Sequence, residues 1–322
     1  MQGKVMPEPN ATPVYAGVDV CKEWLDVHVH PSGQTLRVSN DGVGLRRLKR
    51  LLGGLVVCRV VMEATGKHHR AALRSLHAAG LAVAVVNPLR ARLFAEAAGQ
   101  LAKTDTIDAR LLAIMGAALE PAVTPPPPEA LEEVCELVNA RTAAMAERTA
   151  LSNRLATAGT AFLKTELRRL LQTSERHIKR LDAEIERRIM ADPGMARRHA
   201  ILCSIPGIGS VTAASFLTGL AELGHCSAKQ AAMLAGVAPV ADDSGARTGR
   251  RAIRGGRRQV RNAAYMAALS ASRYNPDLAA FARRLQSTGK RPKIVLVAVM
   301  RKLIVLANTL IKQNRLWSPI NP

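Results

Sequence analysis

Four consecutive prolines, at positions 125–128, are the feature that most restricts how this chain of 322 residues can fold. Proline has no backbone N–H and a fixed φ, so a run of four forms a stiff polyproline segment and excludes a helix. The run predicts a linker over residues 120–129 between two folding regions. A chain of this length is long enough for about two domains.

Residues 1–119 combine short apolar runs with helical patterns. Three strand-like runs come first, at Val14–Val20, Trp24–His30 and Gln34–Ser39, and they predict an antiparallel meander. The continuous apolar run Val56–Met62 is typical of a buried central strand. The remaining segments expected here are helices at Leu45–Leu52, Lys67–Ala79 and Thr104–Ala118 and a strand at Leu81–Val86. This order predicts an α/β domain with a mixed sheet and helices on its faces.

The second region is predicted to be all-α. Residues 130–194 are almost continuously helical in pattern, with a break near Gly159. Apolar residues from Leu167 to Ile189 lie near a heptad seam, whereas Arg141 and Arg148 interrupt the seam of the preceding helix. The pattern indicates a helical coiled-coil arm, which either pairs between subunits or folds back as an intramolecular hairpin. Residues 195–322 are expected to form a compact, mostly helical domain.

The chain carries a formal net charge of +21, and this charge favours a polyanionic partner. Its cysteines are odd in number and form no Cys-x-x-Cys pair, so neither a disulfide framework nor a zinc knuckle is indicated, and a reduced cytosolic setting fits. The apolar run Ile294–Leu310 contains Arg301 and Lys302 near its centre. We therefore expect a buried helix there and no membrane association.

Four acidic residues lie at positions where a predicted strand ends or a predicted helix begins. Asp19 ends the first strand, Glu63 follows the central strand, and Asp105 and Asp108 open a helix. The i, i+3 spacing of the two helical acids puts them on one helical face. If the two strands are neighbours, their carboxyl ends meet the N-terminus of this helix. Four converging carboxylates repel one another, and Mg²⁺ with its preference for oxygen ligands would neutralise them best.

Each acid also has a simpler explanation. A carboxylate in the first turn of a helix is a common cap or a favourable partner of the helix dipole, and an aspartate at a strand end is often a turn residue. The strand–strand–helix order of the four together favours the metal site. Asp26, in the next strand, is a competing ligand that the sequence alone does not exclude.

Residues 204–213, SIPGIGSVTA, form a glycine-rich turn between two helical stretches. Gly207 and Gly209 would let backbone N–H groups face outward at the start of the second helix and hold a phosphate without reading the bases. This is the helix-hairpin-helix pattern of many DNA-binding proteins. A tight helix–helix turn without a ligand is the alternative.

Ser244 stands at the start of a basic, glycine-containing loop. A serine nucleophile needs a base or a metal for activation, and the closest histidine in sequence is His225, so activation would have to come from elsewhere, such as the acidic site. The loop and the segment after it carry arginines whose guanidinium groups suit phosphate oxygens. These are Arg247, Arg250, Arg251, Arg254, Arg257, Arg258 and Arg261. A turn serine followed by a solvated basic loop is the alternative.

Seven segments together resemble one protein family, in order and over nearly the whole chain. They are YAGVDVCKEWLDV, VVMEATG, VVNP, KTDTIDARLLA, IPGIGSVTA, LAGVAPVADDSG and VRNAAYMAAL. The chain resembles the transposases of insertion-sequence family one-ten, also called DEDD transposases. The family often has Glu-Ser-Gly where this chain has Asp243-Ser244-Gly245, which is a mild departure.

The resemblance implies a RuvC-like, RNase H-type domain over residues 1–119, a linker over 120–129, a coiled-coil arm over 130–194 and a transposase domain over 195–322. It implies that Asp19, Glu63, Asp105 and Asp108 are the catalytic tetrad and that Ser244 is the nucleophile. Expected partners are Mg²⁺, donor and target DNA, a bridge RNA that guides the enzyme, and further copies of the chain in a homodimer or homotetramer. The expected location is the nucleoid in the bacterial cytoplasm.

Two other functions remain compatible with the residues. A junction-resolving endonuclease would use metal-activated water and leave Ser244 with a structural role. A non-catalytic nucleic-acid scaffold would show no Mg²⁺-dependent cleavage.

Overall fold

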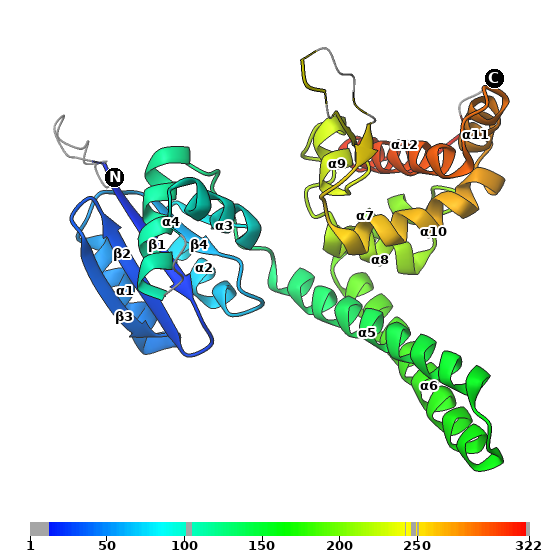
Figure 1. Cartoon of the computed structure of the whole chain (residues 1–322), viewed down its shortest axis with the longest axis horizontal. Coiled ribbons are helices and arrows are strands. Elements are labelled where there is room, and N and C mark those ends of the chain that lie inside the picture. Colours follow the sequence, from blue (N-terminus) through cyan, green and yellow to red (C-terminus); the bar gives the residue numbers. More distant parts are fainter. Residues whose placement is uncertain (1–12, 101–104, 242, 246–248, 250, 320–322) are drawn as a thin grey trace. The chain divides into compact units, whose positions relative to one another are not determined.

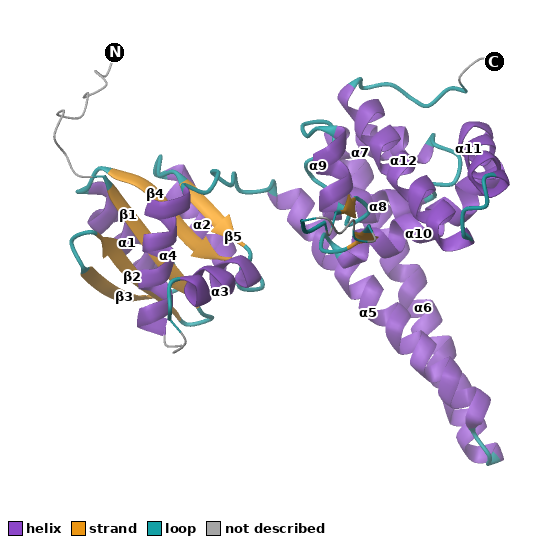
Figure 2. Ribbon diagram, turned by 45° about the horizontal axis from the view of Figure 1, so that its top comes forward, coloured by secondary structure: helices purple, strands orange, loops and turns teal. Residues whose placement is uncertain are grey.

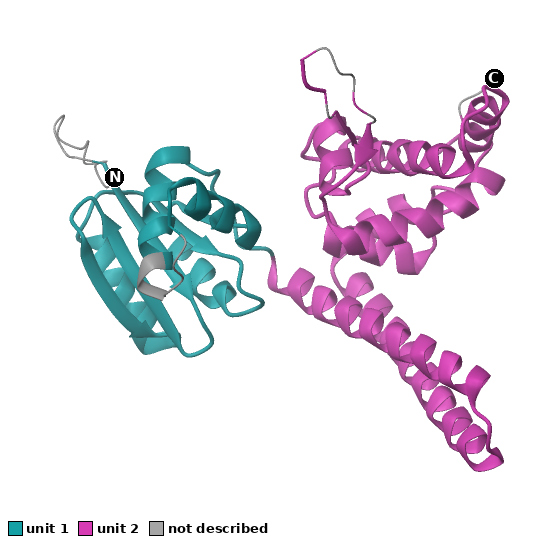
Figure 3. Ribbon diagram, viewed as in Figure 1, with its two compact units in different colours: residues 1–127 teal, residues 128–322 magenta. Residues whose placement is uncertain are grey.

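The structure is a computed structural model that describes residues 13–100, 105–241, 243–245, 249 and 251–319, without the side chains of residues 105–107. The chain divides into two compact units, Met1–Pro127 and Pro128–Pro322 (Figure 3). The first unit combines a sheet with helices, and the second is almost entirely helical (Figure 2). The boundary lies within the proline run.

A five-stranded sheet forms the centre of the first unit, in the order β3-β2-β1-β4-β5 (Figure 1). Its strands are β1 (Val14–Val20), β2 (Trp24–His30), β3 (Gln34–Ser39), β4 (Val57–Glu63) and β5 (Val83–Val86). β1, β2 and β3 form an antiparallel meander, while β4 pairs parallel with β1 and β5 parallel with β4. The expected mixed sheet is confirmed, and the first three strands have the bounds that the sequence predicted.

Helices cover both faces of this sheet. They are α1 (Gly42–Gly53), α2 (His69–Ala78), α3 (Pro88–Ala97) and α4 (Asp105–Leu119). Leucines of α1 and α2 pack with Ala16, Val18 and Met62 on one face, whereas α4 and α3 pack on the other face against Val61 and Val86. The alternation of side chains along a strand therefore assigns odd and even positions of β1 and β4 to different faces.

α3 is a helix that the sequence analysis did not predict. Asn87 accepts a hydrogen bond from the backbone N–H of Leu89, and Pro88 occupies the first helical turn. An N-cap asparagine followed by proline is a recognised signal for a helix start. The signal is present in the sequence, but only the preceding strand, Leu81–Val86, was predicted for this segment.

Gly17 allows α4 to lie directly on β1. A Cβ atom at this position would lie 1.9 Å from the carbonyl oxygen of Ala109 and 2.4 Å from the backbone nitrogen of Ala113. Both contacts are with helix backbone, which cannot move aside as a flexible side chain does. The absence of a side chain at Gly17 therefore fixes the distance between α4 and the sheet.

The linker begins as part of the first unit. The backbone N–H of Thr124 donates to the carbonyl of Val83, and the hydroxyl of Thr124 accepts from the N–H of Val85. These bonds attach residue 124 to the edge strand β5. The connection between the two units therefore consists only of the proline run that follows residue 124.

The second unit is built around one helical core. Its elements are α5 (Glu129–Thr157), α6 (Ala161–Ala191), α7 (Pro193–Cys203), α8 (Ser210–Gly219), α9 (Ala228–Leu234), β6 (Pro239–Val240), β7 (Ala252–Ile253), α10 (Arg258–Tyr274), α11 (Pro276–Ser287) and α12 (Pro292–Lys312). α12 is long and apolar enough to cross a membrane by length and composition alone, but half of its most apolar window is buried. Val299, Leu303 and Ala307 are fully buried in the core, as expected for a core helix.

α5 and α6 fold back on each other as a hairpin within one chain. The chain breaks between Thr157 and Ala161, near the predicted position. Arg141 and Arg148, which interrupt the apolar seam in the sequence, form ion pairs with Asp182 and Glu175 of the opposite helix. The intramolecular alternative is therefore the one that the structure shows.

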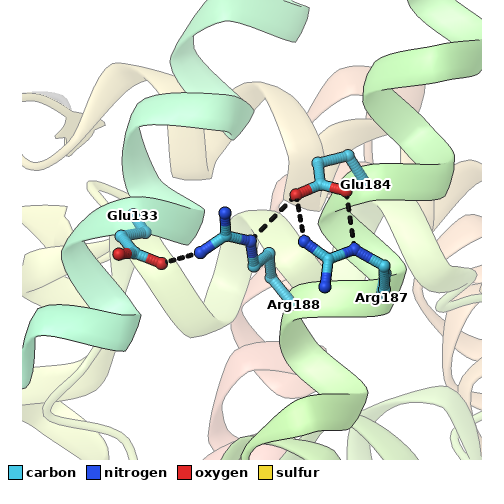
Figure 4. Close-up of polar contacts among 4 residues, drawn as sticks. All are labelled: Glu133, Glu184, Arg187 and Arg188. Atoms are coloured by element: carbon cyan, nitrogen blue, oxygen red, sulfur yellow. Dashed lines mark hydrogen bonds and ion pairs between the residues drawn. The ribbon is translucent and has the colours of Figure 1, made fainter.

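The base of the hairpin is continuous with the rest of the second unit. Val134 and Ile189, one from each helix, are fully buried in the same core as α8, α10 and α12. A charged cluster closes the outside of this base: Arg188 bridges Glu133 of α5 and Glu184 of α6, and Arg187 also binds Glu184 (Figure 4). The hydrogen bonds from Arg187 and then Arg188 lower the pKa of Glu184 to about 2.

Substitution of Gly17 by alanine should lower the stability of the first unit by at least about 1–3 kcal/mol, because the added methyl group overlaps the backbone of α4. Thermal unfolding followed by circular dichroism measures the change. Gly53→Ala is the matched control, since nothing lies within 4 Å of a Cβ at that position. The interpretation is wrong if both variants unfold at the temperature of the parent protein.

Candidate active site

Asp19 and Glu63 lie at the carboxyl ends of two adjacent parallel strands. β1 and β4 are in register with Val18 beside Met62, so the two acids follow at neighbouring positions. Val18 and Met62 both pack on the α1 and α2 face. The next residue on each strand therefore points toward the α4 face. The backbone N–H of Val20 donates a 3.0 Å hydrogen bond to Oδ1 of Asp19.

Asp108 approaches the same edge from α4. It precedes Ala109, the residue whose carbonyl lies against Gly17, and Gly17 is two positions before Asp19 on the same face of β1. Asp108 and Glu63 also line one cavity of about 400 Å³ between β4, α3 and α4. Arg92 and Gln100 line this cavity as well, and the sequence analysis missed both. The tertiary fold thus brings three of the four predicted acids to one edge of the sheet.

The fourth acid, Asp105, is the first residue of α4, one helical turn before Asp108. Its side chain lies outside the described residues. Among the described residues, no group of three or more histidines, cysteines or acids is close enough to hold a metal ion. The donor set nevertheless fits a hard divalent cation, because it consists of carboxylate oxygens on three separate elements.

Asp26, the competing ligand, has a different partner. It lies opposite Asp19 on β1 and opposite Arg37 on β3, so all three residues share the α4 face. Nε and Nη2 of Arg37 each donate a 2.7 Å hydrogen bond to a carboxylate oxygen of Asp26. This two-pronged ion pair neutralises Asp26 beside the acidic group. The alternation of residues along the strand indicated on which face of the sheet Asp26 lies. Its pairing with Arg37 follows only from the register of the two strands.

The two glycines of the glycine-rich turn have different roles. Gly207 has a positive φ of 107°, and a Cβ atom there would lie 2.6–2.7 Å from Ala271 of α10. Gly209 is the exposed N-cap of α8, and no atom lies within 4 Å of the position of its Cβ. Gly207 is therefore required for packing against α10. Contact between the turn and a phosphate remains a prediction, and Gly209 is the glycine at which it would occur.

Ser244 is exposed and lies between the two short strands β6 and β7. Asp243 accepts a 2.9 Å hydrogen bond from the backbone N–H of Gly249 and lies 4.0 Å from Arg251. Gly245 has a φ of 53°, which favours glycine. Arg247 and Arg250, predicted to bind nucleic acid, lie outside the described residues.

The other predicted arginines fall into two groups. Arg251, Arg254 and Arg258 are exposed. Arg257 donates to both carboxylate oxygens of Glu222 and to the carbonyl of Gly219, and its hydrogen bonds to Glu222 raise the pKa of Arg257. Arg261 donates a 2.6 Å hydrogen bond to the carbonyl of Gly255. Binding of Arg257 or Arg261 to a phosphate would have to compete with these internal bonds.

Comparison with known proteins now identifies the class of protein. Residues 16–160 match a family model described as "Transposase", and residues 199–283 match one described as "Transposase IS116/IS110/IS902 family". The first match covers most of the first unit and all of α5, and the second lies within the second unit and includes Ser244. The chain is a DNA transposase, an enzyme of DNA recombination. It belongs to the IS110 family of insertion-sequence transposases.

Three relatives are similar to this chain. The "Pilin gene-inverting protein" of Moraxella bovis and that of Moraxella lacunata are each 28% identical over 316 residues, which cover 94% of this chain and 96% of each relative. The "Insertion element IS900 uncharacterized 42 kDa protein" of Mycobacterium paratuberculosis is 34% identical over 143 residues, 43% of this chain and 34% of that protein.

The two groups of arginines should respond differently to substitution. Arg254→Ala should leave stability unchanged and reduce the salt dependence of DNA binding by about 0.9 in log–log slope, as for one lost phosphate contact. Arg257→Ala should instead lower the free energy of unfolding by about 1 kcal/mol, since its ion pair with Glu222 is partly exposed. Fluorescence anisotropy and chemical unfolding of both variants test the assignment, which is wrong if Arg257→Ala changes only the salt slope.

Proposed function

We propose that this chain cuts and rejoins DNA through a covalent phosphoserine intermediate, with Mg²⁺ at the acidic tetrad and Ser244 as the nucleophile. The observation that carries the proposal is the placement of Asp19, Glu63 and Asp108 at one edge of the sheet. The rival endonuclease would use the same acids and differ only in the nucleophile.

The strand order supports an RNase H/RuvC-like domain. Three antiparallel strands are followed by two parallel strands, and the first strand lies in the middle of the sheet. α4 crosses the face on which the acids lie. This arrangement supports a site formed by acids from the first strand, the fourth strand and a helix, as the proposed family of nucleases and recombinases requires.

We assign Asp19, Glu63, Asp105 and Asp108 to hold the metal. Bound Mg²⁺ would supply a Lewis acid that stabilises negative charge on the phosphate oxygens. The chain's own contribution is to fix the carboxylates: β1 and β4 set the spacing of Asp19 and Glu63, and the contact at Gly17 sets the height of α4. The ion pair with Arg37 keeps Asp26 out of this group.

In the proposed reaction, Oγ of Ser244 attacks the scissile phosphorus and forms an O–P bond. The bond from phosphorus to the DNA 3′-oxygen breaks, and the released 3′-hydroxyl takes up a proton while the serine hydroxyl loses one. A 3′-hydroxyl of the exchanged strand then attacks the phosphoserine and releases Ser244. The number of phosphodiester bonds is unchanged, so strand joining needs no high-energy cofactor.

The names of two relatives favour this reaction over simple hydrolysis. The Moraxella proteins are named for inverting a gene, and an inversion requires rejoining of cut strands as well as cleavage. A nuclease that uses water would leave free 5′-phosphates and would need a separate enzyme to join them. We therefore prefer the phosphoserine mechanism to the junction-resolving endonuclease.

The proposed partners are donor and target DNA, a bridge RNA, and further copies of the chain in a homodimer or homotetramer. The net charge of +21 and the exposed Arg251, Arg254 and Arg258 support a nucleic-acid partner. The aromatic content of 3% offers few stacking surfaces for bases, which suits a protein whose sequence specificity comes from base pairing by a guide. We place the action of the enzyme at the nucleoid in the bacterial cytoplasm.

Substitution of Ser244 by alanine should abolish covalent protein–DNA adducts and leave DNA binding intact. Denaturing gel electrophoresis of reactions with labelled DNA detects the adduct, and anisotropy measures binding. Ser287→Ala is the control, since Ser287 is exposed and its hydroxyl bonds only to a carbonyl of its own helix among the described residues. An adduct that persists without Ser244, or free 5′-phosphate as the only product of the parent protein, would falsify the serine mechanism.

Substitution of Asp105 by asparagine should reduce Mg²⁺-dependent cleavage by more than about 100-fold, because loss of a direct ligand exceeds the usual effect of its supporting residues. Removal of the metal with EDTA should have the same effect on the parent protein. Glu166→Gln, which alters an i, i+3 pair with Arg169 on α6, is the control. Undiminished recombination by the Asp105 variant would exclude it from the metal site.

A further inference from the structure

The helix α10 buries its small residues and exposes its large apolar ones. The side chains that it packs into the core are those of Val260, Ala264, Ala267, Ala268 and Ala271. Its outside carries four large apolar residues that are 39–71% exposed, namely Tyr265, Met266, Leu269 and Tyr274. An amphipathic helix normally turns its large apolar side chains toward the core. A run of them on the outside of one helix therefore indicates a binding surface.

A pocket of about 380 Å³ adjoins this surface, between α10, α11 and α12, the last three helices of the chain in Figure 1. Tyr265 and Leu269 line it from α10, and Leu296 lines it from α12. Its volume falls within the range of about 300–1,000 Å³ that is usual for pockets that bind small ligands. The pocket thus combines an exposed aromatic side chain with an apolar wall.

The charges at the pocket favour an anionic ligand. Each of the three helices contributes one exposed cation to its lining, and these cations are Arg273, Arg283 and Lys293. None of the described residues that line the pocket is acidic. Guanidinium and ammonium groups bind phosphate oxygens. An aromatic ring next to such groups is the combination that recognises a nucleotide, whose base is flat and whose phosphate is charged.

Arg258, the first residue of α10, lies on the same side of the helix as the pocket. Tyr265, Leu269 and Arg273 follow it at i+7, i+11 and i+15, spacings that return to one side of an α-helix. From Arg258 to Arg273 the helix rises about 22 Å, at 1.5 Å per residue. A stacked strand advances about 3.4 Å per nucleotide, so this side of α10 is long enough for several nucleotides.

A nucleic acid suits this surface better than a second copy of the chain does. Tyrosine, methionine and arginine are also common in protein–protein interfaces. A second copy, however, has a net charge of +21, and it would meet a surface whose charged residues are all cations. A base inside a duplex is covered on both faces by its neighbours, whereas an unpaired base can leave the stack and lie on an aromatic ring. The surface therefore favours an unpaired strand.

We propose that the outside of α10 binds an unpaired DNA strand, with one base stacked on Tyr265 in the pocket and phosphates at Arg273, Arg283 and Lys293. DNA as the substrate follows from membership of a transposase family. An exchange of strands leaves bases unpaired until they meet their new partners. The inference depends neither on Ser244 as the nucleophile nor on a metal at the acidic tetrad.

The first probe is fluorescein-labelled oligothymidine, with its binding to the full-length protein measured by anisotropy in EDTA so that no cleavage occurs. An abasic strand of the same length keeps the phosphates and lacks the bases. Tyr265→Ala should weaken binding of oligothymidine about tenfold, since it removes one stacked base, and should leave binding of the abasic strand unchanged. Tyr265→Phe keeps the ring and should bind like the parent protein. Phe162→Ala, which removes an exposed ring from α6, is the matched control.

Arg283→Gln tests the phosphate contacts with the same two strands. It should reduce the log–log salt slope of binding by about 0.7 for the abasic strand as well as for oligothymidine, because it removes one phosphate contact with a single strand. Tyr265→Ala should leave both slopes unchanged, since it removes no cation. A Tyr265→Ala effect that is absent, or that is equal for the two strands, contradicts the proposal.

Two further measurements test the other occupants of this surface. Sedimentation velocity without DNA should give the same subunit count for Tyr265→Ala as for the parent protein, and a lower count would make the surface an interface between copies. Oligouridine should bind no more tightly than oligothymidine, and tighter binding that depends on Tyr265 would overturn the assignment to DNA. Normal recombination by Ser244→Ala or Asp105→Asn would end the proposed chemistry and leave these binding results unaffected.

Discussion

The backbone contact between α4 and β1 at Gly17 is the constraint on which the rest of the first unit depends. The missing side chain lets the backbone of α4 at Ala109 lie directly on β1, and Asp108 is the residue before Ala109. A bulkier residue would lift the helix and separate its acids from Asp19 and Glu63. The proposed acidic site would therefore depend on packing in the core, at a residue that itself has no functional group.

Charge in this protein is divided between structural and functional uses. Three arginines form ion pairs with carboxylates of their own chain. Arg37 does so at the edge of the sheet, Arg257 in the helical core and Arg188 at the base of the arm. Arg254 and Arg258 are exposed. A count of basic residues alone treats both groups as potential phosphate ligands. The carboxylate partners, which come from distant segments, decide which arginines remain for a nucleic acid.

Much of the first unit was predictable because its signals are local. The alternation in Val14–Val20 and Trp24–His30 and the turn at Pro31-Ser32-Gly33 specify the meander, and the predicted strands have the observed bounds. α3 was missed although Asn87 and Pro88 carry a helix-start signal. In the second unit, the same periodicity suits a dimer and a hairpin equally. The choice between them depends on Arg141 meeting Asp182, a pairing across 41 positions that no local pattern reveals.

The sequence by itself determined the division at the proline run, the α/β and all-α character of the two regions, and the residues that resemble a transposase family. These properties follow from backbone restriction, side-chain periodicity and residue identity, which are all readable along the chain. Only the tertiary structure decided that Asp26 is paired with Arg37, that Gly207 packs against Ala271, and that Tyr265 lines a basic pocket between three helices. Those outcomes depend on strand register and on the close approach of helices, because both join segments whose contact is settled by the packing of the whole domain.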